Sequence, residues 1–233
     1  MKKNITSEAK KKLRKKRDKL IEKAFNLLND GVLVHDPKRL DIRGSLSFGN
    51  DVEIDVNVIF EGEVVLGNRV FIGANCILNN CTIGDGTRIN PFSLIEDSSI
   101  GKDSFVGPYG RIRPGTLISN NVQIGNFVEL KNVHVGSYSR INHLSFVGDA
   151  KLEDNVTIGA GSITCNHNGI EIHQTSIKNG AFIGSGCNLI APLTINSGSV
   201  IGAGSTITED TPSNSLSLAR SKQVVVKKWS KDN

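Results

Sequence analysis

The chain has 233 residues, a formal net charge of +5 and 38% hydrophobic residues. It contains no apolar run of about 18 residues, so we expect neither a transmembrane helix nor membrane insertion. The N-terminus also lacks the apolar core of a signal peptide. Four cysteines without Cys-x-x-Cys spacing are typical of a reducing compartment, and we therefore expect a cytoplasmic protein.

The first 23 residues hold eleven of the 28 Lys and Arg and three of the 23 Asp and Glu. This segment therefore carries +8, and the remaining 17 bases and 20 acids give about −3. We expect residues 1–30 to form a basic helix that is capped near Ser7 and stopped by Gly31. Its expected apolar stripe consists of Leu13, Leu20, Ile21, Ala24, Phe25 and Leu28.

The basic face of this helix, Lys10 to Lys19, could contact nucleic acid or anionic lipid. We favour the interpretation in which the basic face is solvated and the apolar stripe of the same helix packs on the rest of the chain or on another subunit. The chain has only one Trp and two Tyr, and no basic surface interleaved with aromatic residues. We therefore expect no nucleic-acid partner.

Beyond the helix, an aliphatic residue returns at every sixth position and is usually followed by glycine. Period six fits neither a helix nor a simple alternating strand, and so short a repeat indicates a stacked-strand solenoid. A small residue usually stands two positions before each aliphatic one and faces the same way in a strand. The two unbroken aliphatic series are Ile100, Val106, Ile112, Ile118, Ile124, Leu130 and Ile183, Leu189, Ile195, Ile201, Ile207.

In places the spacing shortens to five, and whole sets of three hexads lie between these points. This predicts a triangular prism of 18-residue coils with one corner that is one residue shorter. An ordinary β-sandwich would need turn signals every 8–12 residues, and we favour the solenoid. The shortened steps are Leu78 to Ile83, Ile95 to Ile100, Leu130 to Val135 and Val147 to Leu152.

The hexad series breaks between Thr164 and Ile183. We interpret residues 165–180 as a loop that leaves the prism, and long loops on a rigid scaffold are often functional. The expected organisation is therefore a helix at 1–30, a β-helix at 31–210 with this loop, and a C-terminal tail at 211–233. The fold class is all-β, a parallel β-helix with an N-terminal α-helix.

Arg113 and Lys131 are 18 residues apart, and each directly follows an inward aliphatic residue. They are therefore expected to lie one above the other on adjacent coils. Two stacked cations repel each other, and a bound anion such as phosphate would relieve the repulsion. The alternative, left open by the spacing, is that both side chains extend into solvent, with Glu129 as a neighbour.

His143 lies two residues past Ile141, at a predicted corner, where an imidazole can be reached from solvent. From the spacing alone a surface histidine is the simpler interpretation. The other histidines do not stack with His143, so we expect no zinc site, which needs three convergent ligands. The sequence also lacks the glycine-rich phosphate-binding loops of nucleotide enzymes.

Several ordered motifs resemble the acetyltransferase half of the bifunctional bacterial glucosamine-1-phosphate acetyltransferase and N-acetylglucosamine-1-phosphate uridylyltransferase family. The resemblance covers about Leu27 to Trp229. Its motifs are R-I-R-P-G-T from Arg111, N-F-V-E-L-K from Asn126, N-H-L-S-F-V-G-D from Asn142, I-G-A-G-S-I-T-C-N from Ile158, L-I-A-P-L-T-I from Leu189 and L-A-R from Leu218.

The resemblance implies a left-handed β-helix, a homotrimer with active sites between subunits, and acetyl-CoA as co-substrate without a metal. His143 matches the family's general base, and Arg113 and Lys131 match residues that hold the sugar phosphate. Asn166 matches a residue on the sugar side of the site. The positions that match the acetyl-CoA site are Ala160, Ser185, Ala203 and Arg220.

The chain departs from the family at three sugar-side positions. Phe146, Thr157 and Ile172 stand where the family usually has tyrosine, asparagine and lysine. Lost polar partners weaken the binding of a polar ligand by about 1–3 kcal/mol each. The resemblance therefore implies a retained phosphate end and an altered sugar end.

We expect an N-acetyltransferase that converts glucosamine 1-phosphate to N-acetylglucosamine 1-phosphate, a precursor in nucleotide-sugar, cell-wall and lipopolysaccharide synthesis. The alternatives are another amino sugar phosphate, a nucleotide-linked amino sugar, a metal-dependent solenoid enzyme of the carbonic anhydrase type, or a catalytically silent scaffold. No uridylyltransferase half is recognisable, so a separate nucleotidyltransferase is a candidate partner. Met1 and the basic helix favour a free-standing enzyme over a fragment.

Overall fold

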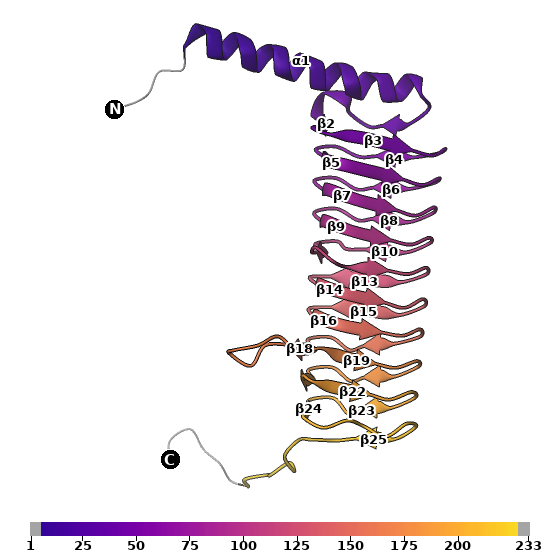
Figure 1. Cartoon of the computed structure of the whole chain (residues 1–233), viewed down its shortest axis with the longest axis vertical. Helices are drawn as coiled ribbons and strands as arrows, with labels where there is room; N and C mark the ends of the chain where they lie inside the picture. The colour runs from indigo at the N-terminus through magenta and orange to yellow at the C-terminus, as the bar shows by residue number, and fades with distance from the viewer. Residues whose placement is uncertain (1–5, 228–233) are drawn as a thin grey trace.

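The computed structural model describes residues 6–227 and consists of one helix followed by a parallel β-solenoid (Figure 1). The N-terminal helix lies across one end of the stacked coils. The solenoid confirms the fold class expected from the period of six. A short 3₁₀ helix, Pro37–Arg39, joins the helix region to the first coil.

The first face of the prism is an eleven-stranded sheet in which each strand pairs with the strand one coil away. Parallel pairing at every step is what a solenoid with one strand per face and coil requires. The strands in spatial order are β1 (Leu33–Val34), β4 (Glu53–Ile54), β6 (Phe71–Ile72), β8 (Arg88–Ile89), β10 (Phe105–Val106), β13 (Gln123–Asn126), β15 (Arg140–His143), β17 (Thr157–Ile158), β20 (Phe182–Ile183), β23 (Val200–Ile201) and β25 (Leu216–Ser217).

The second and third faces form one fourteen-stranded sheet, because the longer strands continue around the corner between them. These longer strands are β5 (Ile59–Leu66), β7 (Ile77–Ile83), β9 (Leu94–Ile100), β14 (Glu129–Val135) and β16 (Phe146–Leu152). The shorter ones are β2 (Asp41–Ile42), β3 (Ser45–Phe48), β11 (Arg111–Ile112), β12 (Leu117–Ile118), β18 (Ile163–Cys165), β19 (Thr175–Ile177), β21 (Asn188–Ile190), β22 (Leu193–Ile195) and β24 (Thr206–Ile207).

The corner between the second and third faces, here called the second corner, is the shortened one. Four of its turns are made by Asn80, Asp97, Asn132 and Asp149, whose φ angles are 46°, 40°, 51° and 47°. Asn and Asp adopt this left-handed conformation more readily than other non-glycine residues. A single such residue turns the chain within a five-residue step, which confirms the expected short corner.

The core is the column of inward aliphatic residues that the hexads define. Ile112, Leu130 and Val147 follow one another on the second face and are at most 1% exposed. Burying each such side chain stabilises the fold by about 1.5–3 kcal/mol. The expected small inward residues are buried too, including Cys76, where burial raises the pKa of the thiol to about 11.

Helix α1 (Ser7–Asn29) is capped by Thr6, whose hydroxyl accepts a hydrogen bond from the N–H of Ala9 at 3.2 Å. The expected cap at Ser7 is therefore wrong by one residue. Only the C-terminal half of the helix lies on the prism, so Ala24 and Leu27 are buried while Leu13 is exposed. Leu13, Phe25 and Leu28 were expected in the packing stripe, and all three are exposed.

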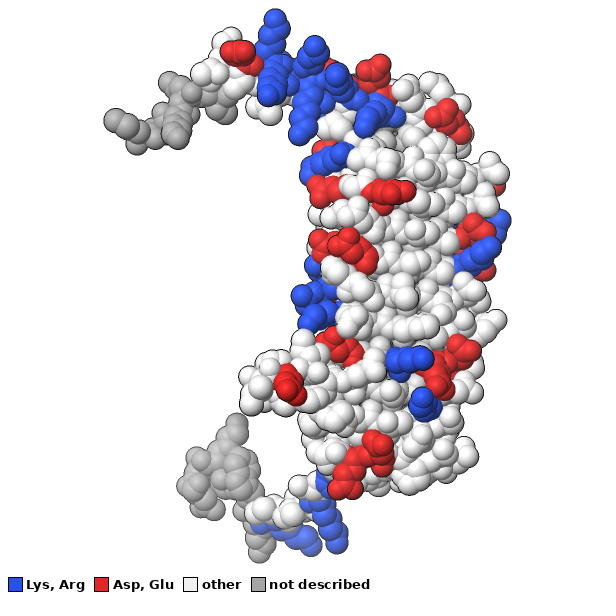
Figure 2. Space-filling model, viewed as in Figure 1, with Lys and Arg blue, Asp and Glu red and all other residues white. Residues whose placement is uncertain are grey.

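The N-terminal half of α1 extends beyond the prism and carries the basic residues (Figure 2). Arg17 is an exception within this group, because it forms an ion pair with Asp41 of the first coil. The basic face is otherwise exposed to solvent, in agreement with the favoured interpretation.

The loop that leaves the prism is shorter than the expected 165–180. Strand β19 already restores the regular coil, and its Ile177 is fully buried between Leu152 and Ile195. Ile177 stands six residues before Ile183, so the hexad phase resumes where the sequence interpretation still placed a loop. Residues 166–174 alone project from the edge of the prism, as Figure 1 shows between β18 and β19.

The region expected as a C-terminal tail, 211–233, begins with ordered structure. Thr211 forms a parallel bridge with Ile195, and β25 pairs with β23. The solenoid therefore continues as far as Ser217 before the chain leaves it.

Candidate active site

Arg113 and Lys131 lie on adjacent coils, as their spacing predicts. Their strands pair so that Ile112 stands opposite Leu130, and the N–H of Arg113 donates to the carbonyl of Leu130 at 2.9 Å. Each cation also has a carboxylate neighbour. Arg113 Nη1 lies 2.8 Å from Glu129 Oε1, and Lys131 Nζ lies 3.8 Å from Asp149 Oδ2. The two carboxylates offset the repulsion between the two cations. Glu129 was expected as a neighbour of the pair, whereas Asp149 was not.

The next residue in the column of Arg113 and Lys131 is Gly148, which has no side chain. The ring of Phe146 lies over it, because a Cβ built on Gly148 would meet Phe146 Cζ at 2.6 Å. The same Cβ would lie 3.0 Å from Nδ2 of the Asn166 side chain. Phe146 and Asn166 therefore meet next to Lys131, and the structure brings these expected sugar-side residues together with the phosphate-side cations.

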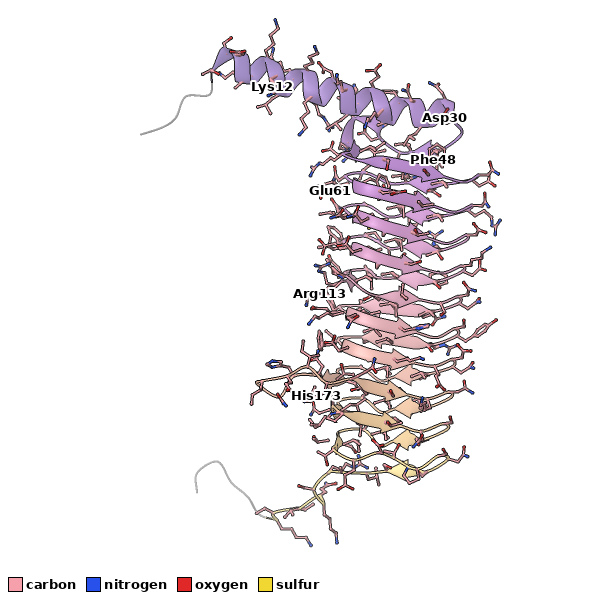
Figure 3. The ribbon with its side chains drawn as sticks, in the orientation of Figure 1. Lys12, Asp30, Phe48, Glu61, Arg113 and His173 are labelled. Carbon is pink, nitrogen blue, oxygen red and sulfur yellow. The ribbon has the colours of Figure 1, made fainter. Side chains whose placement is uncertain are left out.

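The projecting loop begins at this point. Figure 3 shows Arg113 and His173, a residue of the loop, on the same edge of the prism. The loop folds back on itself through an antiparallel bridge between His167 and Ile172. The side chain of Ile172 is exposed, and His173 Nε2 lies 2.9 Å from the side-chain nitrogen of Asn168.

His143 ends strand β15 at the corner between the first and second faces, here called the first corner. Its Nδ1 lies 2.7 Å from Asn126 Oδ1, which is directly opposite on the preceding coil. An amide oxygen only accepts hydrogen bonds, so this contact places a proton on Nδ1, and in the neutral ring Nε2 is then the nitrogen with the free lone pair. The exposed imidazole is therefore oriented as a base and borders a cavity of about 340 Å³ beside Tyr109 and Phe127.

The residues that match an acetyl-CoA site continue the column of His143 along the first corner. Ala160, Ser185 and Ala203 occupy the same turn position on the following coils. Each is followed by a glycine with positive φ, and the space at the missing side chain of Gly161, Gly186 and Gly204 is open. Arg220 reaches this corner and donates from Nη1 to the carbonyl of Ala203 at 2.9 Å.

The expected site residues thus fall into two groups within one chain. His143 and the acetyl-CoA positions lie at the first corner, whereas Lys131 and Asn166 lie toward the second; Phe146 begins the strand between them and turns its ring toward Gly148. The width of the second face, about 10 Å for three strand residues, separates them. Thr157 belongs to neither group, because it stands on the first face between Arg140 and Phe182.

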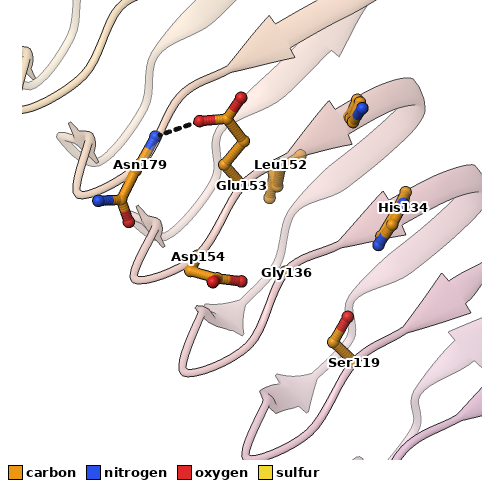
Figure 4. A pocket seen from close by; sticks show the side chains of 8 residues that line it. Ser119, His134, Gly136, Leu152, Glu153, Asp154 and Asn179 are labelled. Atoms are coloured by element: carbon orange, nitrogen blue, oxygen red, sulfur yellow. Dashed lines mark hydrogen bonds between the residues drawn. The ribbon is translucent and has the colours of Figure 1, made fainter.

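A separate pocket of about 290 Å³ lies on the third face and contains His134 (Figure 4). In it, Glu153 accepts a hydrogen bond from the N–H of Asn179 at 3.0 Å. The hydrogen bond from Lys178 is the main cause that lowers the pKa of the Glu153 carboxyl. This pocket shares no residue with the two groups above, in agreement with the expectation that the other histidines do not stack with His143.

The sequence did not reveal three residues that hold the site residues in place. Asn126 and Asp149 were hidden because shortened coils contain 17 residues, so their partners stand 17 and not 18 positions away. Thr164 interrupts the aliphatic column, and its hydroxyl bonds both the N–H and the carbonyl of Gly148 at 2.8 and 3.0 Å. Its departure from the aliphatic pattern was the available signal.

Comparison with known proteins gives two family matches. Residues 42–146 match the GMPPB C-terminal domain, and residues 174–209 match the bacterial transferase hexapeptide family with six repeats. Between residues 6 and 227, no helix combines the length and apolarity needed to cross a membrane. In the same range, no group of three or more His, Cys, Asp or Glu could hold a metal ion.

The bifunctional protein GlmU of Nitrosomonas eutropha is 53% identical over 206 residues, and that of Nitrosomonas europaea is 54% identical. Each alignment covers 88% of this chain and 45% of the relative, so the chain spans about half the length of the curated relatives it matches. Among solved structures, the UDP-N-acetylglucosamine acyltransferase LpxA of Bacteroides fragilis is 17% identical with a TM-score of 0.39, and the match covers 79% of this chain and 68% of that one.

Proposed function

We propose that the chain is an acetyl-CoA-dependent N-acetyltransferase acting on a phosphorylated amino sugar, because residues 174–209 match the bacterial transferase hexapeptide family and the GlmU relatives match 88% of the chain. Glucosamine 1-phosphate is the first candidate acceptor. The observation that carries the proposal is the oriented imidazole of His143 at the head of the column Ala160, Ser185 and Ala203.

In the proposed reaction, the amine of the sugar attacks the thioester carbonyl of acetyl-CoA. The carbon–nitrogen bond forms, the carbon–sulfur bond breaks, and CoA leaves as a thiolate that takes up the proton released by the amine, through His143 or solvent. Nε2 of His143 accepts the proton that the amine loses, and Asn126 holds the ring in the required tautomer. General-base assistance of this kind contributes about 10²–10⁴ in rate.

The acceptor phosphate is assigned to Arg113 and Lys131. A phosphate dianion can accept a fork of hydrogen bonds from the guanidinium and a single one from the ammonium. Glu129 already orients the guanidinium at 2.8 Å, so phosphate has to compete with or displace this carboxylate. If this assignment is right, Arg113 and Lys131 are the residues that distinguish phosphorylated from unphosphorylated sugars.

A neighbouring copy of the chain would complete the site. His143 and the Arg113–Lys131 pair lie at opposite edges of one face, and Thr157 stands on another face. In a homotrimer these edges could meet across subunit boundaries, as the family resemblance implies. We therefore assign the active unit to a homotrimer.

Another amino sugar phosphate, or an amino sugar linked to a nucleotide, is the second candidate acceptor. It is favoured by Phe146 and Ile172, which place an aromatic ring and an aliphatic side chain where the family resemblance implies hydrogen-bonding groups. A polar group left without a partner weakens ligand binding by about 1–3 kcal/mol. A sugar that lacks a hydroxyl at these contacts would therefore bind more tightly than glucosamine.

A thiol-release assay with acetyl-CoA and a panel of amino sugars tests the proposal. The panel pairs each phosphorylated sugar with its unphosphorylated form and includes nucleotide-linked amino sugars. We expect acetylation of a sugar 1-phosphate and a preference over its unphosphorylated form that is lost in Lys131→Ala. Absence of acetyl-CoA binding by calorimetry would instead support a silent scaffold.

A further inference from the structure

Asp149 is the only buried charged residue among those described, and it is 8% exposed. It turns the second corner with a φ of 47°, directly after Gly148. A carboxylate is costly to bury unless charged or polar partners satisfy its oxygens. Its partners therefore reveal which groups this carboxylate holds in place.

Three donors converge on Asp149 from two neighbouring coils. Asn132 Nδ2 donates to Oδ1 at 2.7 Å, Asn166 Nδ2 donates to Oδ2, and Lys131 Nζ lies 3.8 Å from Oδ2. The same oxygen thus faces both Lys131, on the phosphate side of the site, and Asn166, on the sugar side. Asn132 fixes the other oxygen and so sets the plane of the carboxylate.

Asn166 in turn ties together the two ends of the projecting loop. Its carbonyl accepts a hydrogen bond from the N–H of His173 at 2.7 Å, and its own N–H donates to the carbonyl of Thr164 at 3.0 Å. The side chain of Asn166, held by Asp149, is therefore the link between the rigid corner and residues 167–172.

We propose that Asp149 is a positioning residue for the acceptor: its carboxylate aims the ammonium of Lys131 and the amide of Asn166 toward one substrate and fixes the base of the loop. This inference rests on the proposed acetyltransferase function. Asp149 itself does not touch the acceptor, because its side chain is enclosed behind these two groups. Its effect is expected on acceptor binding and not on acetyl-CoA binding.

The test variant is Asp149→Asn, because Asn has nearly the same volume and tolerates the left-handed conformation that Asn132 adopts at the same corner. It removes the charge and replaces one acceptor oxygen with a donor, which then opposes the amide of Asn166 or the ammonium of Lys131. The matched control is Asp97→Asn. Asp97 occupies the same corner with a φ of 40° and accepts from Asn80 Nδ2 at 3.1 Å, but it contacts no site residue.

We expect Asp149→Asn to raise KM for the acceptor phosphate about tenfold or more, as loss of hydrogen bonds to a charged group implies. KM for acetyl-CoA should change little, and Asp97→Asn should leave both constants unchanged. A purely structural role would lower thermal stability or kcat without this selective rise in acceptor KM. That outcome would overturn the proposal.

Hydrogen exchange gives a readout that does not depend on activity. In Asp149→Asn the amide of His173 should exchange faster, together with the rest of the loop base, whereas Asp97→Asn should resemble the wild type. Unchanged exchange at the loop base in Asp149→Asn contradicts the positioning role even if the wild type acetylates no sugar in the panel. A wild type without activity but with faster exchange in the variant would reject only the proposed function.

Discussion

The first corner of the prism changes character along its length. After Asn57 and Asn75 in the first coils, its turn position in the middle coils is occupied by Phe92, Tyr109, Phe127 and Leu144, with φ angles from 51° to 63°. In the C-terminal coils the same position is occupied by Gly161, Gly186 and Gly204, with φ angles from 67° to 72°. The backbone conformation is shared, and only the side chains differ.

Large side chains rarely adopt positive φ, which costs about 1–2 kcal/mol per residue. The aromatic residues recover part of this cost by stacking. Neighbouring rings in the series Phe92, Tyr109 and Phe127 lie 5.0 and 4.9 Å apart and tilt by 8° and 10°. The glycine half has no such conformational penalty at positive φ. It also leaves an open strip along which an extended co-substrate could lie.

His143 stands where the two halves meet, one residue before Leu144 and opposite Asn126. This corner of the solenoid therefore presents an apolar surface on one side of His143 and a flat strip on the other. The proposed reaction uses the flat half for acetyl-CoA and the junction for chemistry.

The largest expected effect comes from removing the base at this junction. We expect His143→Ala to lower kcat by about 10²–10⁴ with little change in KM for acetyl-CoA, because the imidazole transfers a proton and does not line the glycine half. Initial rates of CoA release measure the effect. His134→Ala is the matched control, since His134 lies on the third face, and equal rates in the two variants would refute the assignment.

The next effect tests whether the flat half must stay flat. Gly186→Leu introduces into the glycine half the side chain that Leu144 already carries at the same turn position. Open space is available for this side chain. We expect acetyl-CoA affinity, measured by calorimetry, to fall about tenfold or more because the added side chain lies across the strip. A fall of this size equals about 1.4 kcal/mol.

The control for this change is Gly180→Leu. Gly180 also has a positive φ, 69°, and open space, but it lies at the corner between the third and first faces. Both variants carry the same backbone cost, so a comparable loss of acetyl-CoA affinity in both would show that strain and not obstruction is responsible.

The sequence predicts the scaffold better than the site because the six-residue period by itself specifies the stacked coils. The steps of five predict the short corner, and the 18-residue spacing of Arg113 and Lys131 predicts their stacking. The period does not specify which corner a given side chain borders, so the separation of His143 from the cation pair was not foreseen. The loop was overestimated because Ile177 was not recognised as part of the series.

Counter-ions were harder to predict for a related reason. Asp149 stands 18 residues after Lys131, but the shortened coil pairs Lys131 with Gly148, and the direction in which a side chain turns at a corner depends on local packing. Thr164 could have been identified, since a polar residue in an aliphatic column usually has a specific hydrogen-bonding role.

The aromatic half of the corner can be tested through stability. Tyr109 stacks on both Phe92 and Phe127, so Tyr109→Ala should lower the free energy of unfolding by about 1–3 kcal/mol, at about 0.5–1.5 kcal/mol per stacked pair. Tyr109→Gly should lose about 1 kcal/mol less than Tyr109→Ala, because glycine has no penalty at positive φ. Urea unfolding measures both, and acetyl-CoA affinity should stay unchanged.

The smallest effect concerns two buried thiols in the coil that turns the first corner at Asn75, next to the aromatic series. Burial raises the pKa of Cys76 to about 11 and that of Cys81 to about 12, from an ordinary value of 9.0. A raised pKa in the folded state means that both thiols stabilise the fold fully below pH 9 and lose this contribution as the pH rises toward 11. Melting temperatures between pH 8 and 10.5 should therefore fall more steeply for the wild type than for a Cys76→Ala, Cys81→Ala double variant. Parallel slopes would mean that these thiols ionise in the folded protein as readily as in the unfolded chain, and the stacked coils would then admit water at the small inward positions.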